Sequence, residues 1–117
     1  MTPAPILVLI VNYRTPTLTM QAVAAIAPEV RSRGDAHILV VDNGSRDGSA
    51  AQIEAAINRE GIGDCCSLLT LAENLGFAAG NNAGLEHYRG TASEPHWPDL
   101  VWLLNPDTIA QPRALNS

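Results

Sequence analysis

Four short apolar segments, separated by longer amphipathic or polar ones, set the pattern of this chain. The first, residues 6–11, reads Ile-Leu-Val-Leu-Ile-Val without alternation. Such a run is typical of a strand covered on both faces in a parallel sheet. Similar segments occur at residues 37–42, 67–71 and 100–104. We therefore predict four strands over these ranges.

Helices are predicted between the strands, at residues 16–33, 49–60 and 77–88. Thr15 and Pro16 suit the N-cap and first position of the first helix, and Gly34 suits its end. Apolar residues recur at helical spacing in the first two helices: Leu18, Ala22, Val23 and Ile26, then Ala51, Ile53, Ala56 and Ile57.

The third predicted helix contains two glycines, Gly80 and Gly84. Each weakens a helix by roughly 1 kcal/mol relative to alanine. Close approach of the helix backbone to a strand or a ligand explains them better than helix propensity does.

The alternation of strands and helices predicts right-handed βαβ units. The expected fold is α/β, a mainly parallel open sheet with helices on both faces. Residues 1–117 are expected to form one domain. Pro112 lies near the start of a further helical segment, at residues 109–117, where a domain boundary is not expected. We therefore expect the domain to be truncated.

Composition narrows the classes of function. The chain has 117 residues, 46% hydrophobic and 16% charged, and a formal charge of −5, which makes nucleic-acid binding a poor expectation. Its longest apolar run falls far short of the roughly 20 residues of a membrane span, so a soluble, cytoplasmic protein is expected. Cys65 and Cys66 are adjacent, which suits neither a zinc site nor an unstrained disulfide.

Polar residues follow each predicted strand, at residues 12–14, 42–45, 73–76 and 105–107. The carboxyl ends of parallel strands meet at one edge, where α/β proteins bind ligands. The last stretch, Asn105-Pro106-Asp107, also suits a plain turn. A Gly-x-Gly-x-x-Gly fingerprint, a Walker loop and a Gly-x-Ser-x-Gly elbow are all absent from the sequence. The pattern favours a nucleotide site that uses side chains and a cation.

Four stretches occur in the order and at the spacing of one known family: residues 8–14, 40–49, 74–85 and 102–108. With them the chain resembles the inverting family 2 glycosyltransferases of the GT-A type, and within these the rhamnosyltransferase-like members. The resemblance implies a nucleotide-sugar donor site and roles in cell-wall or polysaccharide biosynthesis. It covers nearly the whole chain.

The resemblance implies that residues 12–14 line the nucleoside pocket and that Asp42 bonds the base or the ribose. A carboxylate at a strand end can accept such a charge-assisted bond. The alternative for Asp42 is a turn cap over Gly44 and Ser45. The full nucleotide-binding set implied by the family is Asn12, Tyr13, Arg14, Asp42, Asn43, Asn74, Gly76, Asn82 and Asn105.

In the family, the stretch containing Asn74, Gly76 and Asn82 closes over the sugar and phosphates of the donor. Many members carry a basic residue directly before the last asparagine, where this chain has Asn81. We expect Asn81 and Asn82 to donate neutral hydrogen bonds there instead. The alternative is an ordinary polar first turn of a helix.

Asp107 is the implied metal ligand, for Mg²⁺ or Mn²⁺, and neutral Asn105 would bond the ribose or the water shell of the metal. The implied reaction is a metal-assisted inverting displacement that transfers a sugar, rhamnose in the closest resemblance, to a hydroxyl acceptor. The catalytic base is expected beyond residue 117. This fragment alone is therefore expected to be inactive.

The expected partners are a dTDP-, UDP- or GDP-linked sugar and, in a longer protein, a glycan or lipid-linked acceptor at the inner face of the membrane. Apolar surface left by truncation favours a homodimer. The rival interpretation is a non-catalytic nucleotide-binding or interaction module with the same fold. A sugar nucleotidylyltransferase ranks last, because the loop after the first strand lacks glycines.

We predict no metal-binding or catalytic role for the histidines and tryptophans. The three histidines, His37, His87 and His96, are too scattered to form a shared ligand set. Trp97 and Trp102 are expected to pack, with stacking on a sugar as the alternative for Trp97.

Overall fold

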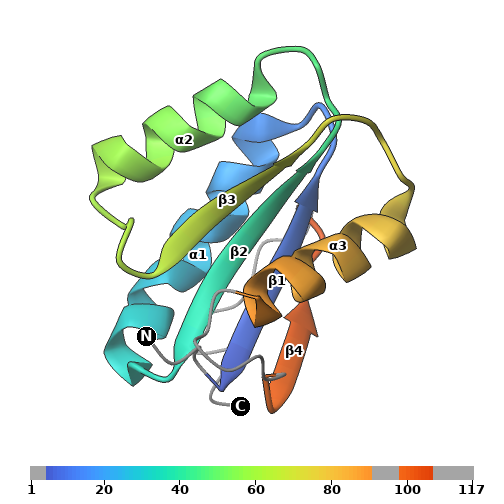
Figure 1. Ribbon diagram of the computed structural model, residues 1–117. Coiled ribbons are helices and arrows are strands. Elements are labelled where there is room, and N and C mark those ends of the chain that lie inside the picture. Colours follow the sequence, from blue (N-terminus) through green and yellow to red (C-terminus); the bar gives the residue numbers. More distant parts are fainter. Residues whose placement is uncertain (1–4, 91–97, 107–117) are drawn as a thin grey trace.

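The computed structural model describes residues 5–90 and 98–106, and these form a four-stranded sheet with three helices (Figure 1). All strand pairs are parallel, in the order β3-β2-β1-β4. The predicted α/β class is confirmed. In chain order the elements are β1 (Ile6–Asn12), α1 (Pro16–Arg33), β2 (Ala36–Asn43), α2 (Ser49–Glu60), β3 (Cys66–Leu71), α3 (Phe77–Arg89) and β4 (Leu100–Leu103).

The two central strands, β1 and β2, are buried on both faces, as their unbroken apolar runs predict. Their even-numbered residues, such as Ile10 and Val40, pack with α1 and α2. Their odd-numbered residues, such as Leu9 and Val41, pack in a second cluster with Tyr88 of α3. Figure 1 shows this arrangement, with α1 and α2 on one side of the sheet and α3 on the other. Alternation along each strand therefore decides which layer a residue joins.

Helix α1 keeps its predicted bounds, and Ala22, Val23 and Ile26 are buried as their helical spacing predicts. It begins at Pro16 and ends before Gly34, whose left-handed backbone (φ 76°) lets its N–H bond Val30. Leu18, expected in the core, is 41% exposed, whereas Thr19 is fully buried. The apolar spacing was wrong by one position there because Thr19 has a buried polar partner, described below. In α2, Ala51 is likewise exposed rather than buried.

The glycines of α3 lie where the helix backbone approaches the sheet. A Cβ atom on Gly84 would lie 2.6 Å from Val41 Cγ2 and 2.9 Å from Leu9 Cδ1. One on Gly80 would lie 2.9 Å from Asn43 Nδ2. Close approach to strand side chains is thus confirmed as the reason for both glycines.

Strand β4 forms one edge of the sheet and is the shortest strand described. It spans Leu100–Leu103, one residue less than predicted, although the N–H of Leu104 still bonds Leu9. Trp102 packs against the cluster on the α1 face, as expected. His96, Trp97 and the helical segment predicted at residues 109–117 lie outside the described residues.

Candidate functional site

The candidate site begins where β1 and β2 end side by side. Asn12, the last residue of β1, is in register with Asp42 of β2. Both side chains are buried, at 0% and 2% exposure. Two polar side chains at the end of an otherwise apolar core are costly unless they are hydrogen-bonded, so their partners identify what the site is built for.

The carboxylate of Asp42 is held by two donors. Its Oδ1 accepts a bond from Asn12 Nδ2 at 2.9 Å and one from Ser45 Oγ at 2.6 Å. The bond from Ser45 is the turn cap that was the alternative for Asp42. Since both bonds fall on Oδ1, the cap occupies one oxygen of the carboxylate and does not exclude the binding role.

Asn12 lies beneath the site and connects Asp42 to helix α1. Its Oδ1 accepts bonds from Thr19 Oγ1 at 2.7 Å and Thr15 Oγ1 at 3.3 Å. Thr15 occupies the N-cap position but makes no capping bond, because its hydroxyl is directed to Asn12. With its amide so engaged, Asn12 can contribute to a ligand by fixing the Asp42 carboxylate. Direct contact with a nucleoside stays a prediction.

Ser45 joins this cluster to the loop after β1, and sequence reasoning did not assign it to the site. It is fully buried, and its Oγ accepts a bond from the backbone N–H of Arg14 at 2.8 Å. Arg14 Nε donates to the Ser45 carbonyl oxygen at 3.1 Å. The available signal was its place three residues after Asp42, which is typical of a side-chain turn.

Arg14 and Tyr13 lie at the exposed rim of the site. Tyr13 is 41% exposed, and the Arg14 guanidinium carbon lies 5.0 Å from the centroid of its ring. The backbone of Arg14 is left-handed, with φ 58°. Such conformations are uncommon outside glycine and cluster at binding sites. Ser45, which bonds Arg14 through both backbone and side chain, holds it in this form.

Asn43, the last residue of β2, bonds to the loop between β3 and α3. Its Nδ2 donates to Asn74 Oδ1 at 3.2 Å and to the Gly76 carbonyl at 3.0 Å, and its Oδ1 accepts the N–H of Leu75 at 3.1 Å. Asn74 Oδ1 also accepts the N–H of Gly76 at 2.8 Å. The predicted site residues Asn43, Asn74 and Gly76 are therefore brought together, as a clamp on the loop between β3 and α3.

Gly44 allows the loop between β3 and α3 to approach the loop after β2. A Cβ atom there would lie 2.1 Å from the Glu73 carbonyl carbon and 2.3 Å from the Asn74 nitrogen, and its φ of +69° disfavours other residues. The loops after β2 and β3 thus touch through their backbones.

The two asparagines early in α3 differ from each other. Asn82 is exposed, which leaves it accessible to a ligand. Asn81 is 8% exposed, and its Nδ2 donates to the carbonyl of Phe77 at 3.1 Å. The expectation that Asn81 donates to a ligand is not supported by this geometry, because its amide N–H group is already turned to its own helix.

At the end of β4, Asn105 is exposed and lies on the same edge of the sheet as the ends of β1 and β2. Asp107, the predicted metal ligand, lies outside the described residues. Within residues 5–90 and 98–106, no three acidic, histidine or cysteine side chains form a group that could hold a metal ion.

Neither cysteine of the described residues has an activated thiol, because burial disfavours the thiolate form of both. Burial raises the pKa of the Cys66 thiol to about 12 and also raises the pKa of Cys65. Near the site, Asp47 accepts bonds from the hydroxyl and the N–H of Ser49, which lower the pKa of its carboxyl. Asp47 therefore caps the start of α2.

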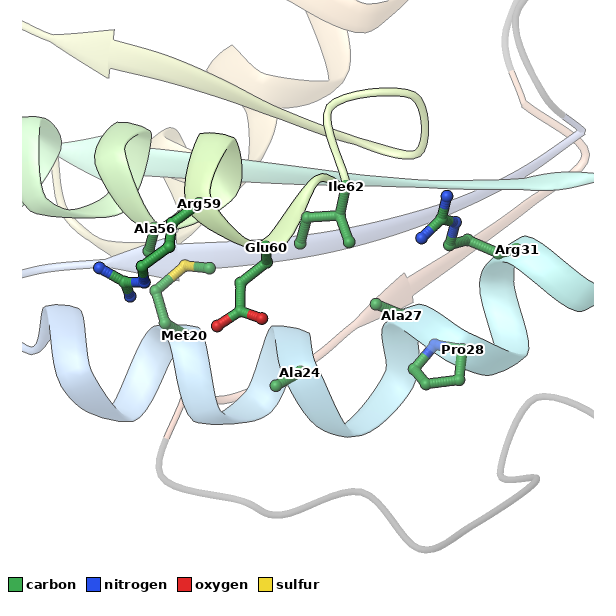
Figure 2. A pocket seen from close by; sticks show the side chains of 9 residues that line it. All are labelled: Met20, Ala24, Ala27, Pro28, Arg31, Ala56, Arg59, Glu60 and Ile62. Atoms are coloured by element: carbon green, nitrogen blue, oxygen red, sulfur yellow. The ribbon is translucent and has the colours of Figure 1, made fainter.

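A groove of about 270 Å³ lies between α1 and α2, away from the strand ends (Figure 2). Small and apolar side chains line much of it, including Ala24, Ala27, Pro28 and Met20, with Arg31, Arg59 and Glu60 around them. No cluster of convergent buried polar groups faces it. We therefore place the candidate site at the strand ends. None of the described helices is long and apolar enough to cross a membrane.

Two solved structures share this fold. One is the mannosyltransferase PcManGT from Pyrobaculum calidifontis in complex with GDP-Man and Mn²⁺, with a TM-score of 0.75 and 20% identity over 97% of this chain. Another is S. aureus TarS 1–349, with a TM-score of 0.68 and 18% identity over 95%. This chain covers only 32% and 30% of those two chains.

No curated protein matches the chain. The family model of glycosyl transferase family 2 matches residues 7–117, which includes both central strands and the polar ends of all four. That match, together with the parallel sheet and its buried carboxylate, shows that the chain belongs to glycosyl transferase family 2.

Proposed function

We propose that this chain is the donor-binding part of a glycosyltransferase, which binds a nucleoside-diphosphate sugar for transfer to a hydroxyl acceptor. The observation that supports it most is the Asp42 carboxylate, fixed by Asn12 and Ser45 at the end of a central strand. The family match over residues 7–117 supports the same class of ligand. So does the neighbour that holds GDP-Man.

In this proposal, Asp42 accepts a hydrogen bond from the base or the ribose. A carboxylate makes such a bond in a charge-assisted form, which is stronger than a neutral one. Its orientation is set in advance by the bonds to Oδ1, so little order is lost when the ligand arrives. Tyr13 and Arg14, exposed at the rim, contact the nucleoside from one side.

Asn105 and Asp107 together fit a hard divalent cation, because such ions prefer carboxylate and amide oxygens. Two protein oxygens are too few to hold Mg²⁺ or Mn²⁺ tightly, so the cation would bind with the diphosphate. It supplies charge neutralisation of the leaving nucleotide. The neighbour with bound Mn²⁺ supports this choice of metal.

The identity of the donor is a finer proposal. The Asn105-Pro106-Asp107 form favours a rhamnosyl donor, which makes dTDP-rhamnose the first sugar nucleotide to test, ahead of UDP- and GDP-linked sugars. We also propose a cytoplasmic location, where nucleotide sugars would reach the site.

Calorimetric titration of the 117-residue chain with dTDP, UDP and GDP, each with and without Mn²⁺, tests the proposal. We expect one nucleotide to bind, and to bind more tightly with Mn²⁺. Asp42→Asn should weaken binding by about tenfold or more, since it removes a charge-assisted bond. Asp107→Ala should abolish the dependence on Mn²⁺.

Asp99→Asn is the matched control, because Asp99 is exposed and lies before β4, at the opposite edge of the sheet. It should leave binding unchanged. Failure of all three nucleotides to bind, or binding that ignores both site substitutions, would contradict the donor site.

A further inference from the structure

The groove between α1 and α2 continues beyond the part drawn in Figure 2. A second hollow of about 430 Å³ adjoins it towards the start of α1, where Pro16 and Thr17 contribute to its lining. The two hollows share five lining residues: Met20, Ala24, Ala56, Arg59 and Glu60. Together they follow α1 as far as Arg31. A groove of this length, on which no buried polar groups of the described chain converge, suits a protein surface better than a small molecule.

Most of α1 presents an uncharged surface beside this groove. From Pro16 to Pro28 the helix contains no acidic or basic residue. Its exposed positions in this stretch are Thr17, Leu18, Gln21, Ala24, Ala25 and Pro28. Helices that face only solvent normally carry charged and polar residues on their outer side. An exposed face of small and apolar residues next to a groove is typical of a surface that another protein covers.

Two neighbouring residues of α2 bring opposite charges to the same groove. Arg59 and Glu60 are exposed, and Figure 2 shows both side chains extending from α2 towards α1. Within the part of the chain that the structure describes, neither side chain has an ion pair or a hydrogen bond, whereas Arg31 on the same groove pairs with Asp64 at 3.5 Å. A cation and an anion without partners therefore border one apolar groove.

This pair of charges is complementary to a copy of itself. In a two-fold dimer, residue i of one copy contacts residue j of the other, and j contacts i. Two neighbouring residues of opposite charge meet this condition, because Arg59 can pair with Glu60 of a second copy while Glu60 pairs with Arg59 of that copy. A partner surface of a single charge sign would match only one of the two residues and repel the other.

We propose that the α1–α2 groove is a two-fold interface between two copies of this chain, in which the uncharged face of α1 is covered and Arg59 of each copy pairs with Glu60 of the other. Apolar contact drives the association. The ion pairs set its orientation, because exposed pairs add little free energy but exclude mismatched surfaces. The groove lies away from the strand ends, so this proposal does not depend on the donor site.

Analytical ultracentrifugation of the 117-residue chain over a series of concentrations tests the interface. We expect a reversible equilibrium between monomer and dimer. Arg59→Glu and Glu60→Arg each place like charges opposite each other across the two-fold axis, and each should weaken dimerisation by about tenfold or more. Mixed in equal amounts, the two variants should associate again, because each supplies the charge that the other lacks. Ala24→Arg, which puts a charge into the groove, should weaken the dimer as well.

Glu54→Arg is the matched control, because Glu54 is exposed on the same helix but lines neither hollow. It should leave dimerisation unchanged. All four positions are at the surface or line the open groove, so circular dichroism and the melting temperature should show folded variants. A wild-type chain that stays monomeric, or a dimer that the substitutions in the groove do not weaken, overturns the interface. Failure of the mixed variants to associate, or stepwise growth beyond a dimer, overturns the two-fold pairing.

Discussion

Asp42 and Asn43 are neighbours on one strand, yet they organise opposite sides of the molecule. Asp42 faces α1, where Asn12 and Ser45 fix its carboxylate. Asn43 faces α3, where its amide is bonded to the loop of residues 74–76. Because successive side chains of a strand point to opposite faces, one residue can hold a charge for a ligand while the next fastens a loop.

A family motif can therefore contain both residues that bind a ligand and residues that hold the protein's own loops in place. Asp42 and Asn43 were both assigned to nucleotide binding from the sequence, but only the Asp42 cluster contains charged groups, the buried Asp42 carboxylate and the exposed Arg14 guanidinium. The Asn43 cluster is satisfied within the protein. The predictions below test whether stability depends on the Asn43 side and ligand binding on the Asp42 side.

The largest effect is expected from Gly44→Ala, which would place a Cβ atom 2.1 Å from the Glu73 carbonyl carbon at a backbone φ of +69°. Steric overlap and left-handed strain together should lower the free energy of unfolding by about 3–5 kcal/mol, measured by urea denaturation. Gly34→Ala is the control, because Gly34 shares the positive φ but has open space around it. It should cost about 1 kcal/mol.

Asn43→Ala and Asp42→Asn contrast the two sides directly. Removing the Asn43 amide leaves the 74–76 loop without three hydrogen bonds and should cost about 2–3 kcal/mol of unfolding free energy. Asp42→Asn can keep its Oδ1 acceptor and should cost less than about 1 kcal/mol while it weakens nucleotide binding. The reverse order of stabilities would refute the division of roles.

Thr19→Val tests the support beneath Asp42. The substitution keeps the shape of the side chain but removes the 2.7 Å bond to Asn12 Oδ1. We expect a loss of about 1 kcal/mol in thermal or urea unfolding, together with weaker nucleotide binding because Asn12 is less firmly held. Thr17→Val, at an exposed position of the same helix turn, should change neither quantity.

The smallest expected effect is a pH dependence of the free energy of unfolding. It comes from His37, near the start of β2. His37 bonds Ser67 Oγ and stacks on Tyr88, and burial lowers its pKa below the ordinary 6.5. The unfolded chain therefore takes up a proton more readily than the folded protein does. Stability should fall as pH drops through about 6.5 towards the folded-state pKa.

His37→Phe removes this titration and keeps a ring against Tyr88. The free energy of unfolding measured at pH 7.5 and 5.5 should differ less in the variant than in the wild type. An unchanged difference would show that His37 does not set the pH dependence. The lowered pKa of Asp47 acts only near and below its ordinary 3.8, where that stabilisation is lost as pH falls.

The fold was largely predictable because local signals agreed with each other. Unbroken apolar runs predicted the strands, and Pro16 and Gly34 marked the ends of α1 correctly. The glycines of α3 also pointed to close packing. The order of the strands was not predictable from these signals, because it depends on which apolar runs pair in space.

The candidate site was predicted only in part. The polar residues at strand ends were recognised, but Ser45 and Thr19 were not assigned to the site. Ser45 also bonds Arg14, 31 residues away, and Thr19 bonds Asn12 from the following helix. The clamp role of Asn43 depends on a loop more than 30 residues later. Asp107 as the metal ligand remains a prediction, because it lies outside the described residues.

The hydrogen bonds that build the site also carry a consequence for folding. Those from Asn12 to Asp42, from Arg14 to Ser45 and from Asn43 to Gly76 span 30, 31 and 33 residues. No single strand–helix unit contains both partners, so the site forms only after three parallel strands have paired. Such long-range pairing is intrinsically slow. A bound nucleotide would therefore report complete assembly of the central sheet and protect its amide hydrogens from exchange as one cooperative unit.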